Sequence, residues 1–479
     1  MRIAPAGDRA LLVDLDDVRT VAAHHAGWAV GHPGIAEMIP AAATVLVILT
    51  EDAEPARVSA WLRETPPAQV LGYSGETITI DVRYDGPDLD EVCATTGLDI
   101  VAVHTGQVWT AAFCGFSPGF AYLVGSDPLS IPRRADPRHL GAGGIRGSGR
   151  RVHRGVPDLV ARRVADHRQH RRGAVGREPG RPRAARARHA RAVPRGDVML
   201  EVLATGPLTT VQDRGRTGWS SLGVGTSGAA DRRSHDAANR LVGNMIDAAT
   251  LEVTLGGLVL RARTEVVLAV TGAPTPFTVD GVPQGHGAVV VVGSGAEIRL
   301  DWAPVGLRTY VAVRGGIDVP RVLGSRSTDS LSGIGPERVA PGALLPIGHD
   351  AEDWPRADMN PYPFEHRTTL RVIPGPRADR FTDDALDLLL AQPWTVRTDS
   401  DRVGMKLQGA EPLSRSREDE LPSEGMVTGA LQVPPSGLPV LFLVDHPVTG
   451  GYPVIAVVVS ADLGSAAQCA PGQTIRFSV

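Results

Sequence analysis

The segment LPVLFLVDHPVTGGYPVIAVVVSAD (438–462) contains two apolar runs, separated by a turn that holds two prolines, a threonine and two glycines. Short runs rich in valine, isoleucine and leucine between turn residues are typical of buried β-strands. Runs of the same kind recur at short spacing upstream, at 266–272, 288–293 and 308–316. This recurrence predicts closed or nearly closed β-barrels with a few helices.

The composition agrees with a strand-rich chain of several domains. A length of 479 residues suggests about three domains at roughly 150 residues each. The 55 glycines, the 38 prolines and an aromatic content of only 4% fit many short strands and tight turns better than helical bundles. We expect further strands at 43–49 and 77–82 and helices at 55–64, 87–97, 231–243 and 383–392.

An arginine-rich segment, residues 140–197, dominates the charge pattern. It holds 16 arginines, no lysine and only four acidic residues. The rest of the chain has 33 basic and 49 acidic residues, a net charge of about −16. An acidic protein with a single arginine block does not have the charge footprint of a nucleic-acid-binding fold, so we expect no nucleic-acid partner.

The arginine-rich segment can also be explained by a change of reading frame in the gene. If its codons are read one base later, the stretch from Arg151 can spell EFTGVYPTSSPGGWRIIGST, and the shifted frame can stop at Val198-Met199. Met199 then resembles the start of a second, overlapping gene. We predict two proteins joined by a frameshift, with 140–197 disordered because it cannot bury a core, and with unpaired strand edges in the first protein. A genuine basic linker is the alternative.

The remaining bulk features predict a cytoplasmic protein without a membrane segment or a metal site. The N-terminus, MRIAPAGDRALLVDL, has no hydrophobic signal core, and no apolar run reaches about 18 residues. The three cysteines, Cys93, Cys114 and Cys469, are scattered and odd in number, which argues against a disulfide framework and a C-x-x-C metal site. The histidines support no metal site, since four of the 14 lie in the arginine-rich segment.

The motif FCGFSPGFAYL (113–123) places Gly115, Pro118 and Gly119 among aromatic residues. Glycines permit positive φ and close backbone approach, so this segment can form a loop that lines a substrate site. We name Phe116, Pro118, Gly119 and Phe120 as candidate substrate-binding residues. A packed β-turn is the alternative interpretation of the same spacing.

Residues 1–139 resemble the B component of bacterial ATP-dependent 5-oxoprolinase, a family also called KipI or the first of the two allophanate hydrolase subunits. The resemblance rests on GDRALLV (7–13), His104, the GFSPGFAYL loop and PRR…PR (132–138). The shifted frame adds VPAGSV, GEFTGVYP, SPGGW and PGTRVRF in the family's order.

Residues 199–479 resemble the C component of the same enzyme, also called KipA or the second of the allophanate hydrolase subunits. The blocks that carry this resemblance are VQDRGRTG (211–218), LVGN (241–244), LEVTLGG (251–257), GGIDVP (315–320), LGSRST (323–328), PGP (374–376), SDRVGMKL (400–407), SEGMVTGALQVPPSG (423–437) and DHPVTGGYP (445–453). The same fold serves as the carboxyltransferase domain of urea carboxylase. His446 and Val403 depart from the family's more frequent arginine and methionine.

The resemblance implies a mainly β fold with an α+β N-terminal part and cyclophilin-like β-barrels. The expected parts are an α+β domain (1–75), the start of a B-like barrel (76–139), the out-of-frame segment (140–197), and two C-like barrels (199–350 and 367–479).

The resemblance also implies the chemistry. A five-membered lactam is a stable amide, so its opening requires activation of the carbonyl oxygen by ATP, cations for phosphate and a base that directs water. The candidate catalytic residues are Arg402, Glu424, Asp213 and Arg216. Further candidates for substrate binding are Asp231, Glu252, Arg326, Lys406, Gln432, Thr449 and Tyr452. Each of these is also a residue type that holds barrel turns together.

Three functions fit the sequence. The first is an ATP-dependent 5-oxoprolinase component that acts with a separate A component, shares ATP with it and contacts a small amide substrate. The second is the carboxyltransferase component of a biotin-dependent urea carboxylase. The third is a KipI/KipA-like regulator of a histidine kinase. No G-x-x-x-x-G-K-[ST] occurs, so a nucleotide site is not a P-loop, and no Met-Lys-Met occurs, so biotin would sit on another carrier.

Overall fold

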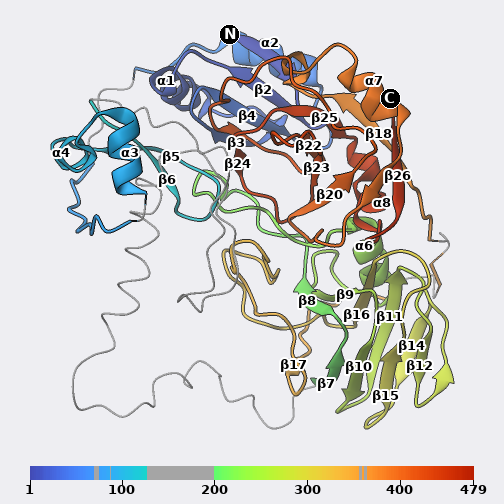
Figure 1. The fold of residues 1–479 in the computed structure, drawn as a ribbon. Coiled ribbons are helices and arrows are strands. Elements are labelled where there is room, and N and C mark those ends of the chain that lie inside the picture. The colour runs from blue at the N-terminus through green and yellow to red at the C-terminus, as the bar shows by residue number, and fades with distance from the viewer. Residues whose placement is uncertain (70–74, 87, 127–198, 355–358, 361–363) are drawn as a thin grey trace, which may run out of the picture.

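The computed structural model describes residues 1–69, 75–86, 88–126, 199–354, 359–360 and 364–479. Strands dominate, as expected, and they form an N-terminal sheet, a two-sheet barrel-like unit and a closed barrel (Figure 1). The arginine-rich segment, the shifted-frame strings and PRR…PR lie outside the described residues. No helix in the described part of the chain is both long and apolar enough to cross a membrane.

The N-terminal sheet is antiparallel, in the order β1-β2-β4-β3. Its strands are β1 (Arg2–Pro5), β2 (Ala10–Asp14), β3 (Ile35–Pro40) and β4 (Thr44–Leu49), and its helices are α1 (Val18–Trp28) and α2 (Pro55–Glu64). The expected strand at 43–49 and helix at 55–64 are confirmed. Asp17 caps α1 by accepting a hydrogen bond of 2.7 Å from the Thr20 N–H.

The N-terminal sheet is buried on both faces. Side chains of Val13 and Val45 pack with Trp28 under the two helices. The alternate residues Leu12 and Leu46 pack on the opposite face in a cluster that includes Val448 from the C-terminal barrel. Successive strand residues point to opposite faces, and both faces are buried here, so β2 and β4 are nearly continuous runs of apolar residues. The sheet is therefore an inner layer of the molecule and not a separate outer module (Figure 1).

The segment between this sheet and residue 126 contains α3 (Leu89–Thr96), α4 (Ile100–Thr105) and a hairpin of β5 (Thr110–Cys114) and β6 (Ala121–Val124). The expected helix at 87–97 is confirmed as α3. The expected strand at 77–82 is wrong: residues 75–86 have no regular secondary structure, and Ile78 is 76% exposed. A strand requires a hydrogen-bonded neighbour, and no described strand pairs with this segment. Within the described residues, β5 and β6 form a two-stranded sheet of their own.

The first C-terminal unit consists of two antiparallel sheets around one core. The six-stranded sheet has the order β13-β12-β15-β10-β7-β17, and the five-stranded sheet has the order β14-β11-β16-β9-β8. Their bounds are β7 (Met199–Thr205), β8 (Leu208–Gln212), β9 (Thr250–Thr254), β10 (Leu258–Ala262), β11 (Val266–Gly272), β12 (Phe277–Val279), β13 (Val282–Pro283), β14 (Val289–Val292), β15 (Glu297–Leu300), β16 (Arg308–Val313) and β17 (Leu344–Pro346). Helix α6 (Arg232–Leu241), expected from the pattern at 231–243, packs against β11 and β16.

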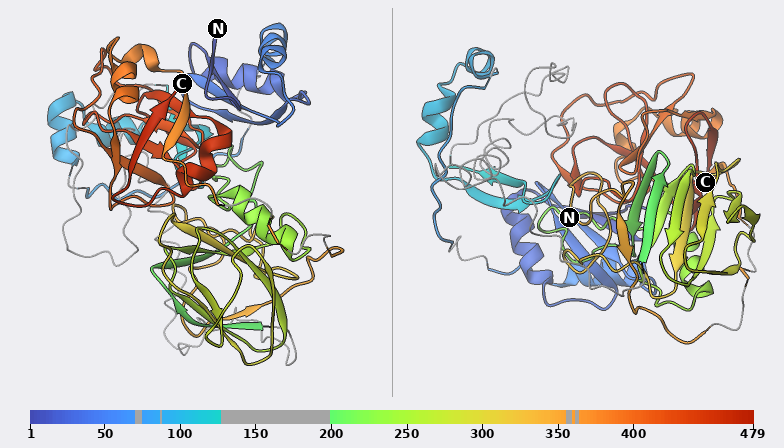
Figure 2. Two further views of the ribbon diagram at one scale, coloured as in Figure 1. Left: turned by 90° about the vertical axis from the view of Figure 1, so that its right-hand side faces the viewer. Right: turned by 90° about the horizontal axis from the view of Figure 1, so that it is seen from below.

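The second C-terminal unit is a closed barrel in the order β18-β25-β22-β23-β20-β19-β26. Its strands are β18 (Thr369–Pro374), β19 (Trp394–Val396), β20 (Gly404–Gln408), β22 (Ala430–Gln432), β23 (Val440–Phe442), β25 (Val454–Val458) and β26 (Thr474–Ser478). Short helices η1 (Ala378–Arg380), α7 (Ala385–Ala391), η2 (Ser460–Asp462) and α8 (Leu463–Ala467) accompany them, and β21 (Glu424–Gly425) pairs with β24 (Thr449–Gly450) beside the barrel. The two apolar runs of 438–462 thus form β23 and β25, which flank β22. In the left view of Figure 2, this orange-to-red unit lies above the green-to-yellow first C-terminal unit.

Candidate functional site

The aromatic loop of the N-terminal part docks on the turn between β23 and β25. The Phe116 N–H donates a hydrogen bond of 2.8 Å to the Thr449 hydroxyl, and the hydroxyl of Tyr122 lies 3.3 Å from the same oxygen. Ser423 extends this row of hydroxyl groups by donating to the Tyr122 oxygen at 3.2 Å. On the other side of the loop, the Gly119 N–H donates to the Leu222 carbonyl at 2.9 Å. Two sequence motifs, far apart in the chain, therefore form one junction.

The sequence of the loop explains this docking. A Cβ at Gly115 would overlap the Thr449 hydroxyl, so only glycine permits the approach. Phe116 and Gly119 have φ values of 60° and 67°, which turn the chain back toward β6. The ring of Phe113 stacks on Tyr122 with centroids 4.4 Å apart. The loop N–H groups at Phe116 and Gly119 are used for docking, as the packed β-turn interpretation expects, and the lining of a substrate site by this motif stays a prediction.

Glu424 lies next to this junction. Its strand β21 pairs with β24, which places Glu424 opposite Gly450. The carboxylate is buried and accepts hydrogen bonds of 2.8 and 3.1 Å from Nε of Arg377, whose Nη1 donates at 3.1 Å to Asp14 of the N-terminal sheet. Burial raises the pKa of Glu424, and the Arg377 guanidinium opposes that shift. Burial thus favours the protonated form of Glu424 more than it does for an exposed glutamate.

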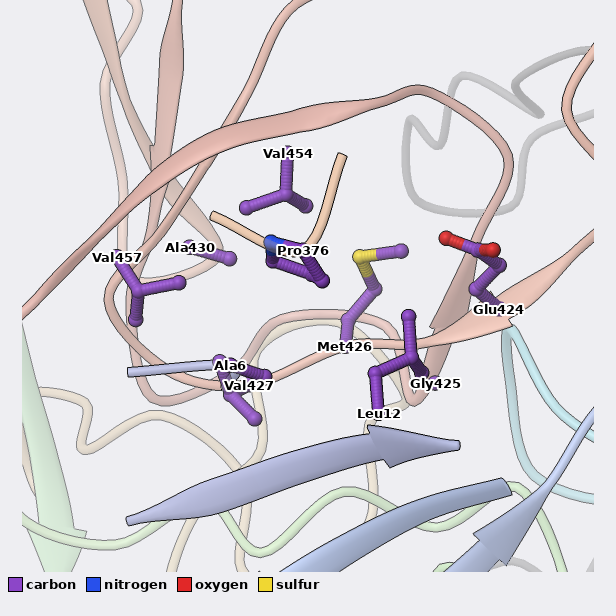
Figure 3. A pocket seen from close by; sticks show the side chains of 10 residues that line it. All are labelled: Ala6, Leu12, Pro376, Glu424, Gly425, Met426, Val427, Ala430, Val454 and Val457. Carbon is purple, nitrogen blue, oxygen red and sulfur yellow. The ribbon is translucent and has the colours of Figure 1, made fainter. Parts of the chain in front are cut away.

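Two cavities adjoin Glu424. The smaller has a volume of about 10 Å³ and is lined mainly by apolar side chains, among them Leu12 and Met426, with Glu424 at one end (Figure 3). The larger is a cleft of about 260 Å³ between the N-terminal sheet and the C-terminal barrel. Its lining residues are Arg2, Asp14, Leu15, Ala43, Thr44, Arg377, Asp379, Arg380, Arg417, Leu421, Pro422, Ser423 and Glu424. We call this space the Arg417 cleft.

Arg402 lies in a different place, buried between the two C-terminal units. Its Nη1 contacts Glu252, its Nε donates to Asp445 at 2.9 Å and its Nη2 donates to the Gly228 carbonyl at 2.6 Å. Burial raises the carboxyl pKa of Glu252 and Asp445, but the Arg402 charge together with the other hydrogen-bond and ionic partners outweighs it and holds both pKa values below their usual range. Nη1 and Nη2 of Arg402 therefore join the two units, while Nε holds Asp445 of its own unit, and none of these contacts involves the aromatic loop.

Asp213, Arg326 and Arg216 lie in the first C-terminal unit. The Asp213 carboxylate accepts from the hydroxyls of Ser325 and Ser327 and from the Arg326 N–H, each at 2.6 Å. The Arg326 side chain is paired with Asp318 and Asp350. Arg216 is 2% exposed and contacts the Ser327 carbonyl, while its Nε and Nη1 have no described partner. These contacts position turns of the first unit away from the junction.

The remaining candidate residues also fall into two groups, one beside the junction and one elsewhere in the molecule. Gln432 donates to the Tyr452 carbonyl at 3.2 Å beside the junction. Asp231 caps α6 and accepts from Gln468 at 2.8 Å. Lys406 is paired with Asp399 at 2.8 Å on the surface. The structure therefore brings together Phe116, Pro118, Gly119, Phe120, Glu424, Gln432, Thr449 and Tyr452, and it places Asp213, Arg216, Asp231, Glu252, Arg326, Arg402 and Lys406 elsewhere.

Sequence reasoning missed Tyr122, Ser423, Arg377 and Asp14. Tyr122 and Ser423 lie inside quoted motifs, and Arg377 and Asp14 directly follow the PGP and GDRALLV blocks. The pairing of Asp14 with Arg377 arises only when the N-terminal sheet packs on the barrel, so the sequence alone does not reveal it.

Comparisons with known proteins agree with this architecture. The family model of the carboxyltransferase domain, subdomain A and B, matches residues 222–479, and that of subdomain C and D matches residues 1–145. The chain is 38% identical over 283 residues to the 5-oxoprolinase C component of Escherichia coli, covering 58% of this chain and 90% of that protein. It is 34% identical over 161 residues to the 5-oxoprolinase B component of Escherichia coli O157:H7, covering 30% of this chain and 72% of that protein.

Two further similarities differ in how much of each protein they cover. A urea amidolyase from Lachancea kluyveri is 31% identical over 322 residues, which are 58% of this chain but only 17% of that protein. The crystal structure of TTHA0988 aligns with a TM-score of 0.77 and 27% identity over 98% of this chain and 100% of that chain. The chain therefore belongs to the carboxyltransferase-domain family, with subdomains C and D (residues 1–145) preceding subdomains A and B (residues 222–479) in one polypeptide.

Proposed function

We propose that this chain unites the B and C parts of a 5-oxoprolinase and acts with a separate A component to open 5-oxoproline to glutamate with ATP. The observation that carries the proposal is the hydrogen bond from Phe116 to Thr449, which joins a motif of the B-like part to a motif of the C-like part. Relatives that match these two parts are named as the B and C components of 5-oxoprolinase. We propose the cytoplasm as its location, where ATP is available and the described cysteines, which are free, stay reduced.

The junction supplies groups suited to amide chemistry. Glu424 can accept or return a proton because burial raises its pKa. Ser423 donates to Tyr122, and one proton forms the bond between Tyr122 and Thr449, so this hydroxyl row keeps one O–H donor for a carbonyl oxygen. Phe116 and Phe120 form an aromatic wall with ring centroids 5.5 Å apart. Arg377 fixes the orientation of Glu424 through two hydrogen bonds. Glu424 is thus the proposed proton-transfer group and Arg377 its positioning residue.

Neither cavity beside Glu424 is large enough to enclose ATP. The Arg417 cleft, at about 260 Å³, lies below the roughly 300–1,000 Å³ of pockets that enclose drug-sized ligands. It accommodates a small acid better than a nucleotide. We therefore propose that the A component provides most of the ATP site, and the roles given above to the residues of this chain do not involve the nucleotide.

The test is ATP-dependent release of glutamate from 5-oxoproline by the purified full chain mixed with an A component. We expect release only when both proteins and ATP are present, and at least a hundredfold loss in Glu424→Gln if Glu424 transfers a proton. The urea amidolyase similarity favours one second candidate, a biotin-linked carboxyltransferase. Turnover of urea with a biotinylated carrier and bicarbonate, without turnover of 5-oxoproline, would establish that candidate instead. Binding of a histidine kinase without either turnover would favour the regulator.

A further inference from the structure

The Arg417 cleft lies between the N-terminal sheet and the C-terminal barrel, and Ser423 and Glu424 are among its lining residues. We propose that this cleft binds the carboxylate of a small monocarboxylic acid. Given the function proposed above, on which this identification rests, the acid is 5-oxoproline, a lactam with a single carboxylate. The cleft would hold the substrate's charged end while its amide faces the junction.

Arg417 lines the cleft and has no carboxylate partner in the part of the chain that the structure describes. Arg377 is fully engaged by Asp14 and Glu424. Arg380 is held from outside the cleft by Asp419 at 3.0 Å. Among the described residues, no carboxylate oxygen lies within 4.0 Å of the Arg417 guanidinium, although four arginines and three acidic residues line the cleft. An anionic oxygen is the partner that this lining lacks.

Thr44 provides the second, independent observation. This residue of β4 lines the cleft, is 3% exposed, and has a hydroxyl oxygen without a hydrogen-bond partner in the described structure. Buried hydroxyls are nearly always hydrogen-bonded in folded proteins. No described protein atom satisfies this hydroxyl, which is shielded beside the cleft, and a ligand carboxylate is the acceptor that it meets when the side chain turns toward the cleft.

The remaining wall is apolar. Leu15, Ala43, Leu421 and Pro422 line the cleft beside the polar groups. A ligand with a compact hydrocarbon ring and one carboxylate matches a wall of this kind, because apolar contacts and a few fixed polar groups together give small-molecule sites their specificity. Inorganic phosphate has the charge but no apolar surface.

Calorimetric titration of the full chain tests this proposal. The probes are 5-oxoproline, 2-pyrrolidone, which is the same lactam without the carboxylate, and inorganic phosphate. We expect binding of 5-oxoproline alone. Arg417→Gln and Thr44→Val should each weaken it about tenfold, which corresponds to about 1.4 kcal/mol. Thr44→Ser keeps the hydroxyl, and Arg338→Gln alters an exposed arginine outside the cleft, so both controls should bind as the parent does.

The outcomes are distinct. Thr44→Val should unfold at a higher temperature than the parent without ligand, because it removes an unsatisfied buried hydroxyl, so weaker binding cannot be ascribed to misfolding. Equal binding of 2-pyrrolidone, displacement of 5-oxoproline by phosphate, or unchanged affinity in both variants overturns the proposal. Glutamate release that persists with an unchanged KM in Arg417→Gln would reject the carboxylate site and leave the proposed function standing.

Discussion

The Phe116 N–H donates to the Thr449 hydroxyl at 2.8 Å, although 333 positions separate the two residues in the sequence. The Tyr122 hydroxyl, from the same hairpin, lies 3.3 Å from that oxygen. Both contacts between the aromatic loop and the TGGYP turn therefore meet at one hydroxyl group, and substitutions at this position separate packing from function.

Replacing Thr449 by valine should lower glutamate release more than it lowers stability. Valine keeps the shape but removes the acceptor, and one hydrogen bond contributes only about 0.5–1.5 kcal/mol to the free energy of unfolding. Urea unfolding and the coupled assay with an A component measure the two effects. Thr449→Ser retains the hydroxyl and should keep most of the activity. Parental activity in Thr449→Val would contradict a functional junction.

Replacing Gly115 by alanine should displace the aromatic loop. The new Cβ would overlap the Thr449 hydroxyl, and overpacking of this kind typically costs about 1–3 kcal/mol. Thermal unfolding and the coupled assay should both show a loss. Gly75→Ala is the matched control, because a Cβ at Gly75 meets no heavy atom within 4 Å. Equal behaviour of the two variants would argue against the close approach.

Replacing Arg377 by glutamine should destabilise the protein strongly. The change leaves Asp14 and Glu424 without their shared cation, and the loss of one partner from a buried ion pair costs about 3–5 kcal/mol. The double variant Arg377→Gln/Glu424→Gln should recover part of the free energy of unfolding, because one unpaired carboxylate is removed. A double-mutant cycle measured by urea unfolding checks the coupling. Additive losses would show that the two side chains act independently.

Acid should weaken the contact between the two C-terminal units. The pKa values of Glu252 and Asp445 are depressed in the folded protein, because the Arg402 charge and their other hydrogen-bond and ionic partners together outweigh the effect of burial. The unfolded state therefore takes up protons first, and this stabilisation is present above about pH 4.5 and is lost as the pH falls through the folded-state values.

The measurement is the free energy of unfolding from neutral pH to about pH 3. Glu252→Gln should start less stable and then lose less stability with acid than the parent does. The exposed Glu265→Gln should follow the parental curve. An unchanged acid slope in Glu252→Gln would remove this carboxylate from the explanation.

Resequencing of the gene across codons 135–142 tests the proposed change of frame, which falls outside the described residues. We expect an inserted or missing base that restores VPAGSV and the following strings. A single clean frame through the arginine codons would show that the segment is genuine. The single-chain alignment with TTHA0988 indicates that the two parts also occur in one continuous chain in a solved structure.

The sequence predicted the strand-rich fold and, at the junction, the two glycine-containing segments but not the charged groups beside them. Runs of apolar residues correctly predicted strands β4, β11, β23 and β25, because a buried strand has a recognisable local sequence pattern. The segment 77–82 has the same pattern but lacks a partner strand among the described residues, and pairing is not a local property. The glycines around Phe116 and Thr449 indicated close approach, whereas the charged candidates were ambiguous: Arg402 and Glu424 look alike in sequence, but one joins two units and the other adjoins a cleft.

The packing of Leu46 against Val448 makes the N-terminal sheet an inner layer of the molecule. Because one polypeptide carries both sides of this contact, their encounter is intramolecular, and its effective concentration does not depend on the concentration of the protein. The pairing of the two halves then does not vary with the level at which the protein is produced. It also fixes their stoichiometry at one to one, so dilution alone should not dissociate the junction.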